Sequence, residues 1–230
     1  MDHHDTVAAL GHHDTVAALG HHDTVAALGH LGAATLGESG ALPMPGRIRP
    51  VWPGASVAAP AFPVTCTPGD NLAVHVAVAT APAGSVLVVD VGDVPDRGYW
   101  GEVLTTAAQA RGLAGLVIDG GVRDVAALER MAFPVFSSGV SLPGATKRNR
   151  GSVGLTAAVA GVPVEPGDWV VGDVDGVVVV RGAVVDDTIA AGRARADGES
   201  QYFAALRRGS TTVDLLHLDA SLIERGGPPA

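Results

Sequence analysis

The chain has 230 residues, of which 47% are hydrophobic but only 4% aromatic, and its formal net charge at pH 7 is −9. This length fits one domain of ordinary size, or one domain with a tail, and can bury a substantial core of Val, Ala and Leu. The negative charge argues against unaided binding of nucleic acid. Cys66 is the single cysteine, so the chain can form neither an internal disulfide nor a thiolate metal cluster.

The sequence contains no pattern for export or membrane insertion. No basic N-terminal region precedes a long apolar run, and no apolar run approaches the roughly 18 residues that a membrane helix requires. We therefore expect a soluble, cytoplasmic protein without a membrane or nucleic-acid partner.

Residues 3–29 are three identical copies of His-His-Asp-Thr-Val-Ala-Ala-Leu-Gly. Nine residues rotate a helix by about 900°, so successive copies would face opposite sides of it, and Gly11 and Gly20 would each cost about 1 kcal/mol. We therefore expect no long rigid helix, and treat residues 1–29 as a mobile repetitive extension of which only the last copy packs on the domain. The His pairs could bind Ni, Cu or Zn, although adventitious binding by a tail is the simpler explanation.

The remaining chain interleaves strand and helix patterns early, clusters strands in the middle and ends in helices. Apolar runs bounded by Gly or Pro predict strands at 55–66, 85–91, 114–118, from 134, and at 156–164, 168–171 and 177–180. Helical periodicity behind capping residues predicts helices at 72–79, 100–110, 124–131, 184–196, 199–207 and 212–223. The pattern predicts one α/β or α+β domain over residues 30–224, with a tail at 225–230.

One stretch places a charged pair at the end of a predicted strand. The apolar run 114–118 leads into Gly120 and Gly121, which are expected to turn the backbone sharply. Arg123 and Asp124 then stand at the carboxyl end of the strand, where open α/β sheets tend to place their ligands. Asp124 could equally be the N-cap of the following helix beside a surface arginine.

Other chemistry-bearing residues each have an ordinary alternative. His75 could be a site residue or a packed histidine on helix 72–79. Glu102 begins a helix, where amides attract anions, and could face a cation or be a surface acid favoured by the helix dipole.

Two loops carry further charged residues. The loop 141–151 carries Lys147, Arg148 and Arg150, which could meet an anionic substrate or be solvated. The segment 173–176 looks like a fragment of a calcium loop, but it lacks the further ligands of an EF-hand. It is better explained as a hairpin turn.

Several motifs in a fixed order connect these residues. They are Pro68-Gly-Asp-Asn71 with His75, Trp100-Gly-Glu102, Ile118-Asp-Gly-Gly-Val-Arg-Asp124, Phe133-Pro-Val-Phe136, Gly151-Ser-Val153, and Pro166-Gly-Asp168 followed by 172–180. Over about residues 31–218 they resemble the RraA-like superfamily. Within it they most resemble the divalent-metal-dependent 4-hydroxy-4-methyl-2-oxoglutarate / 4-carboxy-4-hydroxy-2-oxoadipate aldolases. The resemblance implies a compact α-β-β-α sandwich, similar to swivelling domains, assembled as homotrimers or homohexamers with active sites between subunits.

The resemblance also implies site roles. Arg123 would bind and polarise a small-molecule 2-oxo acid, and Asp124 would hold Mg²⁺ or Mn²⁺ directly. Glu102 matches an acid near the metal. Backbone amides around Glu102, Val103 and Leu104 would bind the pyruvyl carboxylate.

A further acid and two departures complete the comparison with the family pattern. Glu199 matches an acidic position near the metal that a neighbouring subunit supplies. The family loop usually reads Gly-Thr-x-Lys, whereas this chain has Gly144-Ala-Thr-Lys147. Gly154 stands where the aldolases often have Asn. Both departures concern the identity of the substrate more than the chemistry.

The implied activity is retro-aldol cleavage of a 4-hydroxy-2-oxo acid to pyruvate, with oxaloacetate decarboxylation as a side activity. A base must take the 4-hydroxyl proton, and a divalent cation stabilises the charge of the departing enolate. A lysine Schiff base is the rival strategy, and only Lys147, the sole lysine, could form one. The non-enzymatic alternative is an RraA-type regulator that binds an RNA-processing ribonuclease. The combination of Arg123, Asp124 and Glu102 favours catalysis.

Overall fold

The structure, a computed structural model, describes residues 5–224 and 226, with side chains described from Gly20 onward. The helices are α1 (Asp5–Gly37), α2 (Leu72–Thr80), α3 (Glu102–Ala110), α4 (Val125–Arg130), α5 (Val185–Arg207) and α6 (Thr212–Leu215), with 3₁₀ turns at Gly182–Val184 and Ala220–Leu222. Among these residues, no helix combines the length and the apolar character needed to cross a bilayer.

A nine-stranded mixed sheet organises the fold. Its order is β1-β11-β10-β3-β4-β5-β6-β2, with β7 paired to β3 beside this path. The strands are β1 (Leu42–Pro43), β2 (Arg49–Pro50), β3 (Val57–Cys66), β4 (Val86–Asp90), β5 (Gly115–Val122), β6 (Val135–Val140), β7 (Gly151–Val153), β10 (Trp169–Asp173) and β11 (Gly176–Val180). The strands β3 to β6 run parallel, so their carboxyl ends meet at one edge. A separate hairpin pairs β8 (Ala157–Val159) with β9 (Val162–Val164).

The sheet is curled around an apolar interior. A Cβ on Gly172 of β10 would lie 2.8 Å from the ring of Phe136 on β6, so these two strands face each other across the curl. At the rim, the Nη1 of Arg49 on β2 donates to the carbonyl of Asp175, in the β10–β11 turn, at 2.9 Å. The two halves of the sheet therefore behave as two packed layers.

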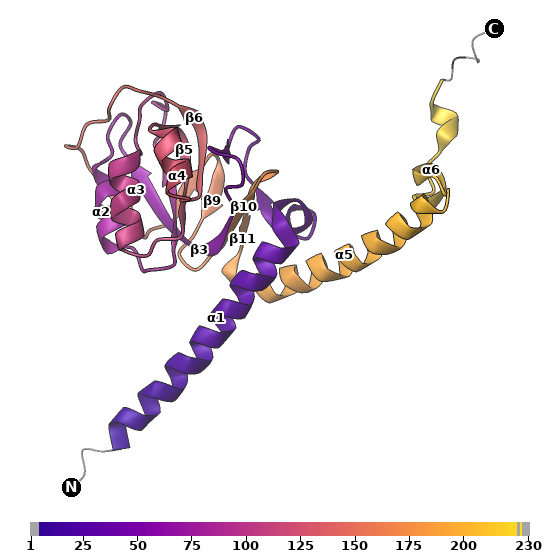
Figure 1. Ribbon diagram of the computed structural model, residues 1–230, viewed down its shortest axis with the longest axis horizontal. Helices are drawn as coiled ribbons and strands as arrows, with labels where there is room; N and C mark the ends of the chain where they lie inside the picture. Colours follow the sequence, from indigo (N-terminus) through magenta and orange to yellow (C-terminus); the bar gives the residue numbers. More distant parts are fainter. Residues whose placement is uncertain (1–4, 225, 227–230) are drawn as a thin grey trace.

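Successive residues of a strand point to opposite faces of the sheet and enter different hydrophobic clusters. On β4, Leu87 and Val89 pack beneath α2 and α3, while Val88 faces the interior of the curl. On β11, Val179 faces that interior, while Val178 packs against α1 and α5. Figure 1 shows α2, α3 and α4 on one side of the sheet and α1 and α5 beside β10 and β11. The predicted α-β-β-α sandwich is thereby confirmed.

The repeats form a helix, so the expectation that they would not is wrong for the described residues. Helix α1 runs from Asp5 to Gly37 and breaks only at Gly32, whose φ is 75° and ψ 168°. Each copy supplies Ala and Leu, which favour helix, and an established helix grows at little cost. The helix therefore forms despite the cost of Gly11 and Gly20. The last copy packs on the body through the fully buried Leu28, and His21 contacts Trp169 with a ring-centroid distance of 4.9 Å.

Three other element predictions need correction. Segment 156–164 is the hairpin β8–β9 rather than one strand, because Ala160 and Gly161 both adopt positive φ and close a tight turn. Segments 184–196 and 199–207 form the single helix α5, in which Arg195 and Glu199 pair across the expected break at 3.0 Å. Segment 212–223 holds only α6 and a 3₁₀ turn, since His217 adopts φ 51°. Of the predicted tail 225–230, only residue 226 lies within the described part.

Candidate functional site

The glycine pair at 120–121 does not turn the chain, contrary to expectation. Strand β5 continues through both residues to Val122, with a register shift between Ile118 and Gly121. A Cβ on Gly120 would lie 2.8 Å from Val91, and one on Gly121 would lie 2.7 Å from the carbonyl oxygen of Arg97. These glycines are therefore required because the segment that precedes α3 lies directly against β5.

The sharp turn occurs at Asp124 instead. Asp124 has φ 59° and ψ 35°, in the left-handed region, and holds the N-cap position of α4 without a side-chain capping bond. Its Oδ2 instead accepts a hydrogen bond from the backbone N of Glu102 at 3.0 Å. The carboxylate therefore stands at the start of α3, where the helix dipole stabilises negative charge. Its role as an ordinary cap of α4 is excluded by this geometry.

Arg123 is held beside Asp124 by backbone contacts. Its N donates to the carbonyl of Trp100 at 2.9 Å. A Cβ on Gly98 would lie 3.1 Å from Arg123 Cδ, and one on Gly101 would overlap Asp124 Oδ2. The Nε of Arg123 lies 3.9 Å from Asp124 Oδ2, with both side chains nearly half exposed. The glycines thus leave room for a cation and an anion side by side at the pocket surface.

The first turn of α3 supplies unbonded donors. Thr105 N donates to Gly101 O at 3.0 Å and so begins the helical ladder. Among the described residues, the backbone N–H groups of Val103 and Leu104 have no acceptor. Free amides at a helix start bind carboxylates and phosphates well.

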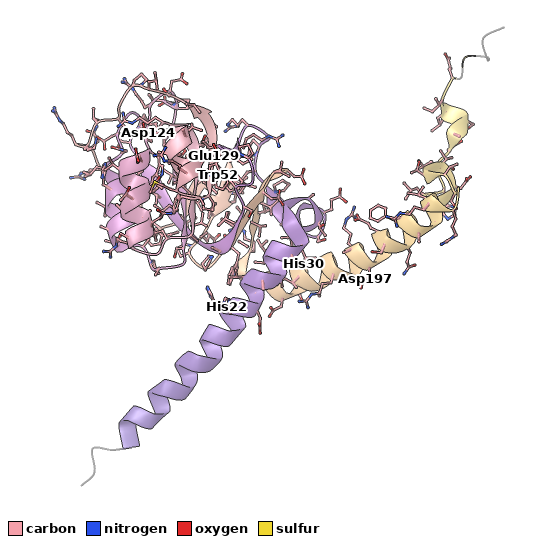
Figure 2. All side chains as sticks on the ribbon, in the orientation of Figure 1. His22, His30, Trp52, Asp124, Glu129 and Asp197 are labelled. Atoms are coloured by element: carbon pink, nitrogen blue, oxygen red, sulfur yellow. The ribbon has the colours of Figure 1, made fainter. Side chains whose placement is uncertain are left out.

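These groups share one cavity of about 160 Å³. It is lined by Asn71, His75, Gly98, Tyr99, Trp100, Gly101, Val103, Leu104, Arg123, Asp124, Gly144, Ala145 and Lys147. Four of the predicted site residues, Val103, Leu104, Arg123 and Asp124, therefore come together as expected. Figure 2 shows Asp124 near the start of α3, on the side of the molecule away from α5.

The two predicted glutamates lie outside this cavity. The carboxylate of Glu102 points toward α4 and meets Arg130 Nη2 at 3.4 Å, with both side chains more than half exposed. Glu199 lies on α5, which projects from the sheet in Figure 1, and pairs with Arg195 at 3.0 Å. Within one chain Glu199 does not reach the pocket, and its contribution from a neighbouring subunit stays a prediction.

Asp70 holds the loop that carries Lys147 against the pocket. The Oδ2 of Asp70 accepts from Arg148 N at 2.6 Å, Asn149 N at 3.1 Å and Thr146 Oγ1 at 2.7 Å. Burial alone would raise the pKa of Asp70, but these bonds and one from Leu72 N outweigh it and lower the pKa to about 2. Lys147 lines the pocket, whereas Arg148 and Arg150 do not.

The cavity wall formed by α2 contains two buried polar atoms that could not be predicted from the sequence. Asn71 Oδ1 and His75 Nε2 are buried and have no hydrogen-bond partner within the described part of the chain. Burial, and then the charge of Lys147, lower the pKa of His75 and so favour its neutral form. The motif at 68–75 includes His75, but neither the burial of Asn71 nor its free oxygen can be inferred from a sequence pattern.

A larger cavity of about 430 Å³ lies at the carboxyl edge of β4 to β6. Its lining includes Asp93, Asp96 and Asp119. Arg47, the one cation in its lining among the residues that the structure describes, donates through Nη2 to Asp119 Oδ2 at 2.7 Å. The remaining surface is acidic and repels an anionic substrate. The smaller cavity, with the guanidinium of Arg123 at its wall, is the better candidate.

A divalent cation fits the donor set at Asp124. The Oδ1 of Asp124 has no hydrogen-bond donor among the described residues, so it is an open carboxylate oxygen. The described residues contain no cluster of three His, Cys, Asp or Glu side chains suited to a metal. Within the described part of one chain, a closed structural zinc site made of such residues is therefore excluded. The single open carboxylate of Asp124 suits Mg²⁺, which usually keeps water and substrate oxygens beside one or two carboxylates.

The Aldolase/RraA family model, named RraA-like, matches residues 13–179. The chain belongs to the RraA-like family. A relative from Halalkalibacterium halodurans, provisionally named 4-hydroxy-4-methyl-2-oxoglutarate aldolase, is 37% identical over 133 residues, which cover 58% of this chain. The chain spans 63% of that relative's length.

Two solved structures share the fold of this RraA-like protein. An uncharacterised protein from Pseudomonas syringae pv. tomato is 29% identical, with a TM-score of 0.73 over 83% of this chain and 91% of its own. The RNA-processing inhibitor RraA from Thermus is 28% identical, with a TM-score of 0.55 over 61% of this chain and 84% of its own. The fold is thus shared by an uncharacterised protein and by a protein described as an RNA-processing inhibitor.

Proposed function

We propose that this RraA-like protein cleaves a 4-hydroxy-2-oxo acid by a metal-dependent retro-aldol reaction that releases pyruvate. The substrate would be 4-hydroxy-4-methyl-2-oxoglutarate or 4-carboxy-4-hydroxy-2-oxoadipate, and oxaloacetate decarboxylation would be a side activity. One observation carries the proposal: Arg123, Asp124 and the free amides of α3 face one cavity. The provisional aldolase name of the Halalkalibacterium relative supports it.

The pocket would bind the pyruvyl end of the substrate through fixed donors. The amides of Val103 and Leu104 would receive the carboxylate. The guanidinium of Arg123 would bind the 2-oxo oxygen and one carboxylate oxygen through its planar fork. As the C3–C4 bond breaks, its electron pair stays on the pyruvyl fragment, and the proton of the 4-hydroxyl passes to a base. Donors already in place stabilise that charge without reorganisation.

Asp124 would hold Mg²⁺ or Mn²⁺ through its open oxygen. When bound, such a cation supplies Lewis-acid stabilisation of the negative charge on the 2-oxo oxygen. Glu102 could approach the metal by leaving Arg130, because an exposed ion pair contributes only about 0–1 kcal/mol. In a homotrimer or homohexamer, Glu199 of a neighbouring copy would add a further acid.

A second candidate is a non-catalytic regulator that binds an RNA-processing ribonuclease. The likeness to the RNA-processing inhibitor from Thermus favours it. A surface that only binds a protein has no need for a cation, an open carboxylate oxygen and two free amides around one small cavity. The site therefore gives more support to catalysis.

Pyruvate release distinguishes the two functions. The full chain is assayed with 4-hydroxy-4-methyl-2-oxoglutarate and with oxaloacetate, after EDTA treatment and again after Mg²⁺ is restored. Turnover that requires the metal and disappears in Arg123→Ala supports the proposal, whereas Glu129→Ala, on the exposed side of α4, should behave as the wild type. Absence of metal-dependent turnover, together with inhibition of a ribonuclease, would establish the regulator instead.

A further inference from the structure

An arginine of α4 holds the carboxylate of Glu102 on the α4 side of α3. Arg130 Nη2 meets Glu102 Oε1 at 3.4 Å. Arg130 Nη1 also donates to the carbonyl of Ala126, one turn back along α4, at 3.3 Å. The guanidinium therefore lies back along α4, with one nitrogen on the helix backbone and the other on Glu102. Within the described part of the chain, Glu102 is the one carboxylate that pairs with Arg130.

The backbone of Glu102 lies directly beside Asp124. Because Glu102 N donates to Asp124 Oδ2 at 3.0 Å, the Cα of Glu102 lies no more than about 4.5 Å from that oxygen. Helical side chains tilt toward the N-terminus of their helix, and Glu102 is the first residue of α3. A change of side-chain rotamer can therefore move the Glu102 carboxylate from Arg130 toward Asp124 while both helices stay in place.

The carboxylate of Glu102 would thus have two positive partners once a divalent cation is bound at Asp124. Mg²⁺ is usually bound through one or two carboxylates, so a second acid beside Asp124 would strengthen the site. A carboxylate that is paired with Arg130 is not free for this role. Both side chains of the pair are more than half exposed, and exposed ion pairs contribute little free energy. A divalent cation can therefore draw Glu102 away, but at the cost of the pair.

We propose that Arg130 is a positioning residue that competes with the metal for Glu102, and so weakens the binding of a divalent cation at Asp124. This inference rests on the proposed function, in which Asp124 holds the cation. The charge of Arg130 would also repel a nearby cation directly. Repulsion does not require Glu102, whereas competition does, so substitution of Glu102 separates the two effects. Because both side chains are exposed, their substitution should leave the fold intact.

The test is calorimetric titration of Mn²⁺ into the full chain after EDTA treatment, at low ionic strength, where screening is weakest. Arg130→Met should bind Mn²⁺ about two- to fivefold more tightly than the wild type, the ratio that corresponds to an exposed ion pair. Arg130→Lys, which keeps the charge, should retain the wild-type affinity. Arg111→Met removes the same charge about 13 Å away, at the other end of α3, and should leave the affinity unchanged.

The same titrations with Glu102→Gln complete a double-mutant cycle. Glu102→Gln should bind Mn²⁺ more weakly than the wild type, and adding Arg130→Met to it should restore nothing. A gain in Arg130→Met that survives Glu102→Gln, or no gain beyond that of Arg111→Met, overturns the competition. Absence of Mn²⁺ binding in both the wild type and Arg130→Met overturns it as well.

Pyruvate release from oxaloacetate and 4-hydroxy-4-methyl-2-oxoglutarate, measured on the same samples, distinguishes this inference from the function on which it rests. Metal-dependent release without the expected pattern of Mn²⁺ affinities leaves the aldolase standing alone. The expected pattern of affinities without release leaves the competition between Arg130 and the metal, and removes the aldolase.

Discussion

The two carboxylate oxygens of Asp124 have different surroundings. Oδ2 accepts from Glu102 N at 3.0 Å and joins α4 to α3, while Oδ1 remains open to the pocket. The bond to Oδ2 therefore contributes modestly to stability, whereas Oδ1 would be essential as a ligand of the metal.

We expect Asp124→Ala to abolish pyruvate release and to lower the free energy of unfolding by roughly 1–3 kcal/mol, because it loses a bond like that of a helix cap and places alanine in a left-handed conformation. Release is measured with a coupled assay and stability by urea unfolding. Asp124→Asn, which tolerates the left-handed backbone, is the matched control for conformation. A folded Asp124→Ala protein with wild-type turnover would remove Asp124 from the mechanism.

Gly101 determines how closely the start of α3 approaches this carboxylate. A Cβ there would overlap Asp124 Oδ2 and lie 3.1 Å from Arg123 Cγ. Gly101→Ala should therefore displace both charged groups and reduce kcat/KM by about tenfold or more, since misplaced catalytic groups are costly. Gly139→Ala, whose Cβ would meet no atom within 4 Å, is the control. Equal kinetics in the two variants would contradict this account of the pocket.

For single residues, the sequence predicted which side chains line the pocket but not the hydrogen bonds that position them. The position of Arg123 and Asp124 behind a strand made them candidates, because strand ends are local features, and the resemblance to the RraA-like superfamily implied their roles. The bond from Glu102 N to Asp124 depends on the segment before α3 lying against β5, which is a tertiary arrangement. The open Oδ1 of Asn71 is equally a product of packing.

Among the elements, the loop 141–150 depends on one buried carboxylate. Asp70 is 2% exposed, and the hydrogen bonds that it accepts lower its pKa to about 2, below the usual value near 4. Because the folded-state pKa is the lower one, this contribution to stability is complete above about pH 4. It is lost as the pH falls through about 2.

We therefore expect the wild type to exceed Asp70→Asn in thermal stability by a constant margin from pH 7 to about 5. The margin should shrink as the pH falls from about 4 to about 2. Melting temperatures across this range provide the measurement. A margin independent of pH down to about 2 would show that the charge of Asp70 does not stabilise the loop.

Helix α1 changes direction at Gly32, where a hairpin of the sheet caps its last segment. The N of Ala33 donates to Asp173 Oδ2 at 2.7 Å, and Gly32 has φ 75° and ψ 168°, a conformation that is nearly exclusive to glycine. The segment 173–176 forms the predicted hairpin turn, and its contact with α1 is a tertiary feature that the sequence does not indicate.

Gly32→Ala should lower the free energy of unfolding by roughly 1–3 kcal/mol, because alanine is strained in this conformation. Gly29→Ala is the control, since it lies in the regular helix and its Cβ would make an ordinary 3.6 Å contact with Ala58. That change should be neutral or stabilising, because alanine is the better helix former. Urea unfolding measures both, and equal stability of the two variants would contradict a required break at Gly32.

The elements themselves were predicted well where the pattern is local and poorly where tertiary contacts decide. Strands β3, β4 and β10 and helices α2 and α3 were placed within a few residues, because apolar runs and capping residues mark them. The continuity of α5 was missed because Gly198 resembles a stop. In the structure the preceding turn continues through it, with the Arg195–Glu199 pair at 3.0 Å across the site.

For the whole molecule, the central question is whether the negative charge that develops on the pyruvyl fragment is stabilised by a metal ion or by a Schiff base with a lysine. Lys147 lines the pocket, so the rival Schiff base has a residue in place. We nevertheless expect EDTA to abolish turnover and Mg²⁺ to restore it, because Asp124 offers an open carboxylate oxygen as a ligand for the cation. Borohydride with pyruvate should leave the mass of the protein unchanged. A reduced adduct at Lys147 would replace the metal mechanism.

The repeats give α1 a length that can change without any change to the body. Each nine-residue copy adds about 13.5 Å of helix and about two and a half turns. Loss or gain of one copy by recombination between identical repeats would alter the reach of α1, shown extending past the sheet in Figure 1, and would reverse the direction its outer face points. Changes of two copies would restore that direction. The number of copies can thus change the length of the N-terminal helix in fixed steps, while the pocket at the other side of the sheet stays as it is.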